Sequence, residues 1–167
     1  MVQKMMLFDF RKKTSQTEWG SVNDVVMGGL SDSGFEILED GFAIFSGIVS
    51  LEHGGGFASV KTKPRNFNLS SFRGVRLKLR GDGKRYSFRI RDTDDVNRPA
   101  YEMSFDTKEN MWQELDLPFE DFKAVFRGRV IEDAGPLHAA GIVQFGFMIK
   151  DRQPGPFKLN VERIEAL

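Results

Sequence analysis

The chain has 167 residues, 40% of them hydrophobic, and its 24 Lys and Arg residues balance 24 Asp and Glu residues. This length is enough for one domain with a full core, and the charge balance argues against a general nucleic-acid binder, which would carry a basic excess. The absence of cysteine excludes a disulfide framework, a zinc–thiolate site and a cysteine nucleophile.

The first ten residues, MVQKMMLFDF, are too short and too mixed in character for a secretory signal. No apolar run approaches the roughly 20 residues of a membrane-spanning helix. We therefore expect a cytoplasmic protein with no signal or transit peptide, and one domain over residues 1–167.

Short segments of alternating apolar and polar residues follow one another along the chain, as in half-buried strands. LFDF near the amino terminus predicts a first strand, and FEIL and FAIFSGIVS predict a hairpin around Glu39-Asp40-Gly41. A second hairpin is predicted where VRLKLR and YSFRIR flank Gly81-Asp82-Gly83. The remaining predicted strands are FASVKTK, YEMSFD, WQELDLP, IVQFGFMIK and FKLNVERI.

Helical periodicity is weak throughout the sequence. The best short stretch is FEDFKAVF, in which Phe119, Phe122 and Phe126 would share a face, and a further helical turn is expected at residues 136–140. Loops are expected at residues 11–18, 92–99 and 127–135. About eight to ten strands with little helix predict an all-β fold, a β-sandwich or jelly roll.

The alternation also predicts which side chains meet the core. Val75, Leu77 and Leu79 should face inward, as should Tyr86, Phe88 and Ile90, which leaves the intervening basic residues on an outer face with Glu102 and Asp106. Two interpretations stay open: a self-neutralising face whose cross-strand pairs are each worth roughly 0.2–1 kcal/mol, and a docking face for an acidic partner. The candidate binding residues are Arg76, Lys78, Arg89, Arg91 and Glu102.

The stretch WGSVNDVVMGGLS, at residues 19–31, looks like neither a helix nor a strand. Asp24 can accept hydrogen bonds from backbone N–H groups a few residues on, and Gly28 and Gly29 allow a positive φ. With Trp19 as a large side chain to bury, we interpret the stretch as a structural loop over one end of the sandwich. Asp24→Ala is expected to cost roughly 1–3 kcal/mol of stability, and Gly28→Val at least as much.

No motif for catalysis, a cofactor or a metal emerges. The sequence has no G-x-S-x-G elbow, and its Gly54-Gly55-Gly56 run precedes a strand where a phosphate loop needs a helix. His53 and His138 have no partner at a metal-ligand spacing. The acidic loop at residues 92–97 fails the EF-hand pattern, although a looser calcium site there stays open as an alternative. We expect no cofactor and no enzymatic activity.

Eight blocks in order along the chain resemble the signature of the complex I intermediate-associated protein (30 kDa) family. They are W-x-x-V-N-D-x-V-M-G-G-x-S (19–31), F-S-G-x-V-S (45–50), G-G-F-A-S (55–59), G-D-G-x-x-Y (81–86), P-F-x-x-F (118–122), R-G (127–128), G-F-M-x-x-D (146–151) and G-P-F-x-L (155–159). The resemblance implies a jelly roll of the galactose-binding-domain-like type. It also marks Trp19, Asn23, Asp24, Gly28, Gly29 and Asp151 as a family motif loop with a mainly structural role.

The same resemblance implies a non-enzymatic role, since mitochondrial members are assembly factors for NADH:ubiquinone oxidoreductase (complex I). Some relatives fuse this domain to a nucleotide-binding one. With neither an Arg-rich presequence nor a second domain, this chain is expected to be a free-standing prokaryotic member.

Two binding hypotheses follow: a chaperone-like protein-interaction module, or a sugar binder like the carbohydrate-binding modules of similar fold. Sugar platforms present Trp or Tyr rings, but this chain has 16 Phe with only 2 Trp and 2 Tyr. Tyr86 and Tyr101 have core-facing parity, and Trp112, which could face outward, stands alone. We therefore favour a protein partner. The discriminating observation is whether the concave sheet face carries stacked aromatic rings or interleaved charges.

Overall fold

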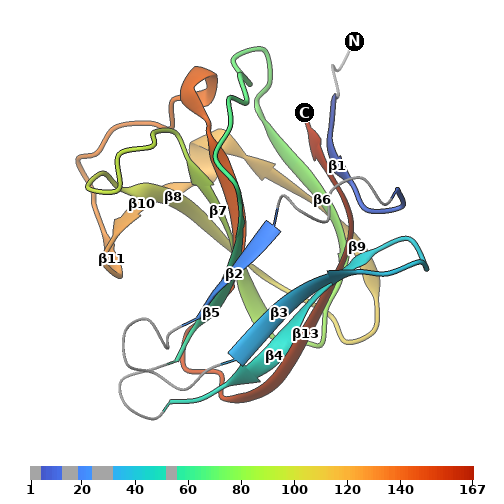
Figure 1. The fold of residues 1–167 in the computed structure, drawn as a ribbon. Coiled ribbons are helices and arrows are strands. Elements are labelled where there is room, and N and C mark those ends of the chain that lie inside the picture. The colour runs from blue at the N-terminus through green and yellow to red at the C-terminus, as the bar shows by residue number, and fades with distance from the viewer. Residues whose placement is uncertain (1–4, 13–18, 24–31, 52–55) are drawn as a thin grey trace.

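Two antiparallel sheets pack face to face around a hydrophobic core in the computed structural model (Figure 1), which describes residues 5–12, 19–23, 32–51 and 56–167. The all-β sandwich predicted from the alternating segments is confirmed. The only helices among the described residues are the two short 3-10 turns η4 (Phe119–Asp121) and η5 (Ala139–Gly141). No helix in these ranges has the length and apolar character needed to cross a membrane.

The six-stranded sheet is built around β13, the long strand near the carboxyl terminus. Its order is β3-β4-β13-β6-β9, with β1 paired to β13 beyond the end of β4. The bounds of its strands are β1 (Met5–Asp9), β3 (Asp32–Ile37), β4 (Ala43–Val49), β6 (Gly74–Arg80), β9 (Trp112–Pro118) and β13 (Gly155–Ala166).

The seven-stranded sheet forms the other layer, with the order β11-β10-β8-β7-β12-β5-β2. Its strands are β2 (Trp19–Asn23), β5 (Ala58–Thr62), β7 (Arg85–Arg91), β8 (Ala100–Asp106), β10 (Lys123–Phe126), β11 (Arg129–Val130) and β12 (Gln144–Ile149).

Alternate residues of both sheets supply the core, as the sequence pattern predicted. Val75, Leu77 and Leu79 of β6 are fully buried, and so are Phe88 and Ile90 of β7 with Tyr86 nearly so. Because side chains of successive strand residues point to opposite faces, the charged residues between them lie on the outer faces of the sandwich. The hairpin around Gly41 is also confirmed: β3 pairs with β4, and Gly41 takes a φ of +92°.

The predicted hairpin at Gly81-Asp82-Gly83 is wrong. β6 pairs with β13 and β9, whereas β7 pairs with β8 and β12, so this connection carries the chain from one sheet to the other. The Asp82 carboxylate accepts hydrogen bonds from the Tyr86 hydroxyl at 2.9 Å and from the backbone N–H of Lys158 at 2.8 Å. These bonds tie the connection to β13, so the turn residues serve a crossover between sheets.

Four local predictions also need correction. FEDFKAVF is one 3-10 turn followed by β10, because Ala124 and Val125 are buried in a strand that pairs with β8. The helical turn expected at residues 136–140 is the 3-10 turn η5. Residues 19–23 form β2, which pairs along β5, and the expected loop at 127–135 contains the short strand β11.

Candidate functional site

The five candidate residues of the predicted charged face separate onto opposite sides of the sandwich. Arg76 and Lys78 lie on β6, on the outer face of the six-stranded sheet, whereas Arg89, Arg91 and Glu102 lie on the other sheet. The separation follows directly from the crossover between β6 and β7. The five residues therefore do not form one surface.

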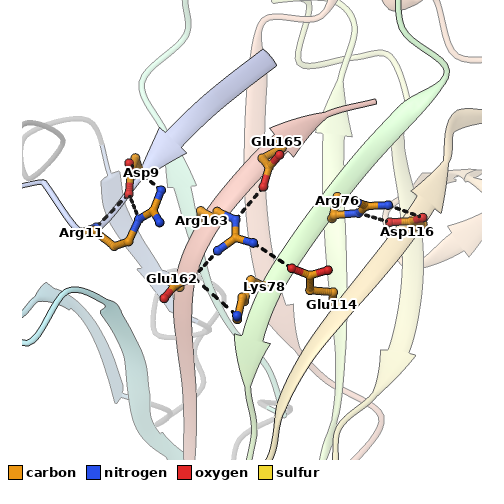
Figure 2. A network of polar contacts seen from close by, with 9 residues as sticks. All are labelled: Asp9, Arg11, Arg76, Lys78, Glu114, Asp116, Glu162, Arg163 and Glu165. Carbon is orange, nitrogen blue, oxygen red and sulfur yellow. Dashed lines mark hydrogen bonds and ion pairs between the residues drawn. The ribbon is translucent and has the colours of Figure 1, made fainter. Parts of the chain in front are cut away.

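A network of ion pairs covers the outer face of the six-stranded sheet (Figure 2). Arg163 of β13 is its centre: it contacts Glu165 at 2.6 Å, Glu114 at 2.7 Å and also Glu162. Arg76 donates two hydrogen bonds to Asp116, at 2.6 and 3.1 Å, and Lys78 lies 4.0 Å from Glu162. Carboxylates thus balance the basic residues here, so we do not assign binding to this face.

A groove of about 560 Å³ crosses the outer face of the seven-stranded sheet, and it is our candidate site. Residues of β5, β7, β8, β10 and β12 line it, and the Asp151-Arg152 loop after β12 lies at one end. The sheet curves from β11 to β2 at the left of Figure 1. Of the candidate residues, Arg89, Arg91, Glu102 and Asp151 all line this groove.

The floor of the groove is a row of residues in register across four strands. Glu102 lies opposite Arg89, Arg89 opposite Gly146, and Gly146 opposite Lys61. A Cβ on Gly146 would come within 2.7 Å of the Val60 carbonyl oxygen, so the close approach of β5 to β12 requires glycine there. β12 therefore presents no side chain between Lys61 and Arg89, which leaves the floor open at that point.

Glu102 is the buried anion of this floor, with a side chain only 6% exposed. Its Oε2 lies 3.3 Å from Arg89 Nε, and its Oε1 pairs with the Lys150 ammonium. Burial lowers the pKa of Arg89, Glu102 counteracts this effect, and the nearby charge of Arg91 lowers the pKa further. Two cations thus share one carboxylate in a partly desolvated place.

Basic residues outnumber acidic ones around the whole groove. Six cationic side chains line it, against two carboxylates: Lys61, Arg89, Arg91, Arg127, Lys150 and Arg152, with Glu102 and Asp151. Sequence reasoning missed Lys61, Arg127, Lys150 and Arg152. The alternation in FASVKTK already places Lys61 on the outer face, but the other three lie at strand ends or in turns, where periodicity gives no signal.

The tryptophan and tyrosine residues lie outside the groove, whereas Phe57, Phe145 and Phe147 line it. Neither Trp nor Tyr is among the described residues that line the groove. Tyr86 and Tyr101 are buried on the core side, as predicted. Trp112 lies on the outer face of the other sheet and does not stand alone, since its ring centroid is 5.7 Å from that of Phe42 and the Arg80 guanidinium lies 5.0 Å above it.

The family motif loop divides between the core and the end of the groove. Trp19 is buried and stacks on Phe35, with ring centroids 4.9 Å apart, in keeping with a structural role. Asn23 is the last residue of β2 and pairs with Ala58, and Asp24, Gly28 and Gly29 lie outside the described residues. Asp151 and the adjacent Arg152 take left-handed backbone conformations, with φ of 65° and 53°.

Side-chain groups that could hold a metal ion are absent from the described ranges. In the acidic loop after β7, Asp92 accepts a hydrogen bond from the His138 backbone N–H at 2.9 Å, and Asp95 accepts one from Asn97 N–H at 2.9 Å. These carboxylates therefore satisfy loop backbone donors. His53 lies outside the described residues.

Comparison with known proteins identifies similar chains. The model of the family described as complex I intermediate-associated protein 30 matches residues 8–161. An uncharacterised protein of Schizosaccharomyces pombe is 31% identical, over 98% of this chain and 84% of its own length. The mitochondrial complex I intermediate-associated protein 30 of mouse is 29% identical over 98% of this chain, which spans 56% of the mouse protein. The corresponding Drosophila protein is 24% identical, with 61% of its length covered.

Solved structures with the same fold include carbohydrate-binding modules and an agarase. The family 11 module of Clostridium thermocellum, solved with a mixed-linked tetrasaccharide, matches with a TM-score of 0.75 and 18% identity, over 100% of this chain and 96% of the module. The agarase AgWH50C matches with a TM-score of 0.68 and 12% identity over 98% of this chain, which covers 24% of the enzyme. These similarities confirm the jelly-roll fold.

Proposed function

The chain belongs to the complex I intermediate-associated protein 30 family, and on that premise we propose that it is a non-enzymatic protein-interaction module with a role in complex I assembly. The partner binds in the groove of the seven-stranded sheet. The partners are complex I subunits or assembly intermediates, and no cofactor takes part. A cytoplasmic location and a prokaryotic origin stay predictions, because the mouse and Drosophila relatives are mitochondrial proteins.

The character of the groove is the observation that supports this proposal most directly. Its charged side chains are interleaved with the apolar Met148 and Val125, and no Trp or Tyr is among its described lining residues. Protein-binding surfaces combine apolar contacts with complementary charges, whereas a sugar platform needs exposed aromatic rings to stack on the sugar. Stacked aromatic rings or interleaved charges are the features expected from the sequence to separate the two hypotheses. The interleaved charges of the groove favour a protein partner.

Sugar binding is the second candidate, because the fold matches the family 11 carbohydrate-binding module over the whole chain. Phe57 is the partly exposed aromatic side chain among the lining residues, and one such ring gives a sugar little to stack on. Isothermal titration with a mixed-linked β-1,3-1,4 tetrasaccharide tests this candidate. We expect no saturable heat; saturable binding that is lost on Phe57→Ala would favour the sugar hypothesis.

An affinity purification from the native organism at low salt tests the protein-binding proposal. Three tagged forms are compared by mass spectrometry: the wild type, the groove variant Lys61→Glu/Arg152→Glu, and the control Lys78→Gln on the opposite face. We expect wild type and Lys78→Gln to enrich the same complex I subunits or assembly proteins and the groove variant to lose them. Undiminished capture by a groove variant that melts like the wild type would place binding elsewhere.

A further inference from the structure

The groove carries cations that no carboxylate in the described part of the chain neutralises. Glu102 is shared by Arg89 and Lys150, and Asp151 lies 3.9 Å from Arg85. A further three exposed cations on the groove have no ion-pair partner within the part of the chain that the structure describes: Lys61, Arg127 and Arg152. Since the whole chain has a formal charge of zero, the positive excess here is a local property of this face.

Arg91 adds to this excess, because none of the described carboxylates forms an ion pair with it. One of its guanidinium nitrogens donates to the carbonyl oxygens of Asp95, at 2.7 Å, and Arg98, at 3.4 Å. These bonds hold the side chain against the loop after β7, and because carbonyl oxygens carry no net charge, they do not neutralise the guanidinium. Arg91 therefore raises the positive potential at Arg89, its neighbour two residues earlier on the same strand, and a negative group bound there would be favoured.

The opposite face offers a contrast within the same fold. There, each of the cations Arg76, Lys78 and Arg163 has a carboxylate within 4.0 Å, and Figure 2 shows the carboxylates placed around them. The charged residues of a sheet face can thus neutralise one another in this protein. The excess of positive charge on the groove face is therefore not a general feature of the strands of this protein.

The shape of the floor suits an extended chain. Lys61 and Arg89 lie two strands apart across Gly146, which corresponds to about 10 Å. Alternate side chains of an extended peptide project on the same side at intervals of about 7 Å, and the long Lys and Arg side chains can adjust to meet them. Met148 and the largely buried Val125 also line the groove and give it apolar surface, and methionine adapts to varied partners.

We propose that the groove binds an extended, acidic segment of its protein partner. The carboxylates of that segment pair with Arg89, Arg91 and Lys61, and its small apolar side chains contact Met148 and Val125. This inference rests on the proposed function and specifies the chemistry of the partner. An anionic polysaccharide or a single-stranded nucleic acid would share the charge, but these ligands stack on several exposed aromatic rings, and Phe57 is the one partly exposed aromatic side chain among the described lining residues.

Fluorescence anisotropy with two defined probes tests the inference. One is a labelled peptide of about eight residues that alternates glutamate and alanine, and the other has glutamine in place of every glutamate. Binding is measured with the full chain at about 20 mM and about 200 mM salt, between which the Debye length falls from about 20 Å to about 7 Å. The variants are Lys61→Glu/Arg152→Glu, whose exposed positions tolerate the change, and the control Lys78→Gln.

We expect the glutamate peptide to bind wild type and Lys78→Gln alike, and to bind the groove variant on the order of tenfold more weakly. Binding should weaken at the higher salt, and the glutamine peptide should bind at least about tenfold more weakly than the glutamate peptide. Equal binding of the two peptides, or equal binding by the groove variant, would overturn the inference.

The peptide result is read together with the co-purification. If complex I proteins co-purify but the peptide does not bind, only the acidic specificity is refuted. If the co-purification and the peptide binding both fail, the proposed function is refuted as well. A heparin fragment is added as a third probe for the polysaccharide alternative. If it binds as tightly as the glutamate peptide, or more tightly, the groove is assigned to anionic sugars and the inference is overturned.

Discussion

Arg89 Nε lies 3.3 Å from Glu102 Oε2, and the two residues face each other directly across β7 and β8. Pairing of opposite charges on neighbouring strands was one of the two interpretations of the outer face that the sequence left open. The expectation that such pairs are exposed is wrong here, because the whole Glu102 residue is only 7% exposed. The value of about 1 kcal/mol or less applies to exposed pairs. The pair belongs to the floor of the groove, where water does not screen it well.

Glu102→Gln is expected to lower the free energy of unfolding by about 3 kcal/mol, because it leaves Arg89 and Lys150 without their shared carboxylate. Urea unfolding at neutral pH measures the change. Glu114→Gln is the matched control: its partner is Arg163, its side chain is 46% exposed, and its loss should cost about 1 kcal/mol or less. Equal losses in the two variants would show that burial does not strengthen the Glu102 pair.

Gly146→Ala should destabilise the protein by about 1–3 kcal/mol, because the added methyl group would meet the Val60 carbonyl oxygen at 2.7 Å and push β5 away from β12. Gly34→Ala in β3 is the control, since its added methyl group has no atom within 4 Å, and it should change stability by about 0.5 kcal/mol or less. Thermal melting of both variants tests the difference. A wild-type melting temperature for Gly146→Ala would mean that the two strands can separate without cost.

We expect Trp19 to contribute to the stability of the fold through the packing of its ring. Its ring packs against Phe8, Phe10, Phe35 and Phe147 with centroid distances from 4.9 to 6.0 Å. Trp19→Ala should cost about 3–5 kcal/mol. Trp19→Phe should cost only about 1 kcal/mol, because it keeps an aromatic ring and removes the buried Nε1 donor, which has no hydrogen-bond partner among the described residues. If Trp19→Ala unfolds at the wild-type urea midpoint, the structural interpretation of this residue is wrong.

The pair between Asp9 and Arg11 should make stability depend on pH in acid. Hydrogen bonds from the Arg11 side chain lower the pKa of Asp9 below its ordinary value of 3.8. A lowered folded-state pKa contributes stability that is full above the ordinary pKa and is lost as the pH falls through the folded-state pKa. Arg11→Gln should therefore be less stable than wild type at neutral pH, with the difference shrinking in acid. Urea unfolding of both proteins between about pH 7 and about pH 2.5 follows the difference; one that stays constant into strong acid would contradict the assignment.

Much of the fold could be predicted from local patterns. The side-chain period of two fixes which residues face inward, so Val75, Leu77 and Leu79 were predicted for the core, where they lie. The hairpin around Gly41 was predictable for a similar reason, since a tight turn with a positive φ at glycine joins strands that can pair at once. The family signature and the jelly roll followed from ordered blocks along the whole chain.

The assignment of strands to sheets was decided by the tertiary structure. Every strand offers the same backbone donors and acceptors to its neighbours. The two strands that flank Gly81-Asp82-Gly83 could therefore be taken for a hairpin from the sequence alone. Contacts remote in the sequence decide otherwise: Asp82 binds Lys158 of β13, and Thr107 Oγ1 donates to the Lys84 carbonyl oxygen at 2.7 Å. Because of that crossover, Arg76 and Arg89, only 13 positions apart in the chain, lie on opposite faces of the sandwich. The groove gathers Lys61, Arg89 and Lys150 from three strands or their ends, and only the pairing of those strands, which depends on long-range backbone hydrogen bonds, brings their charges together.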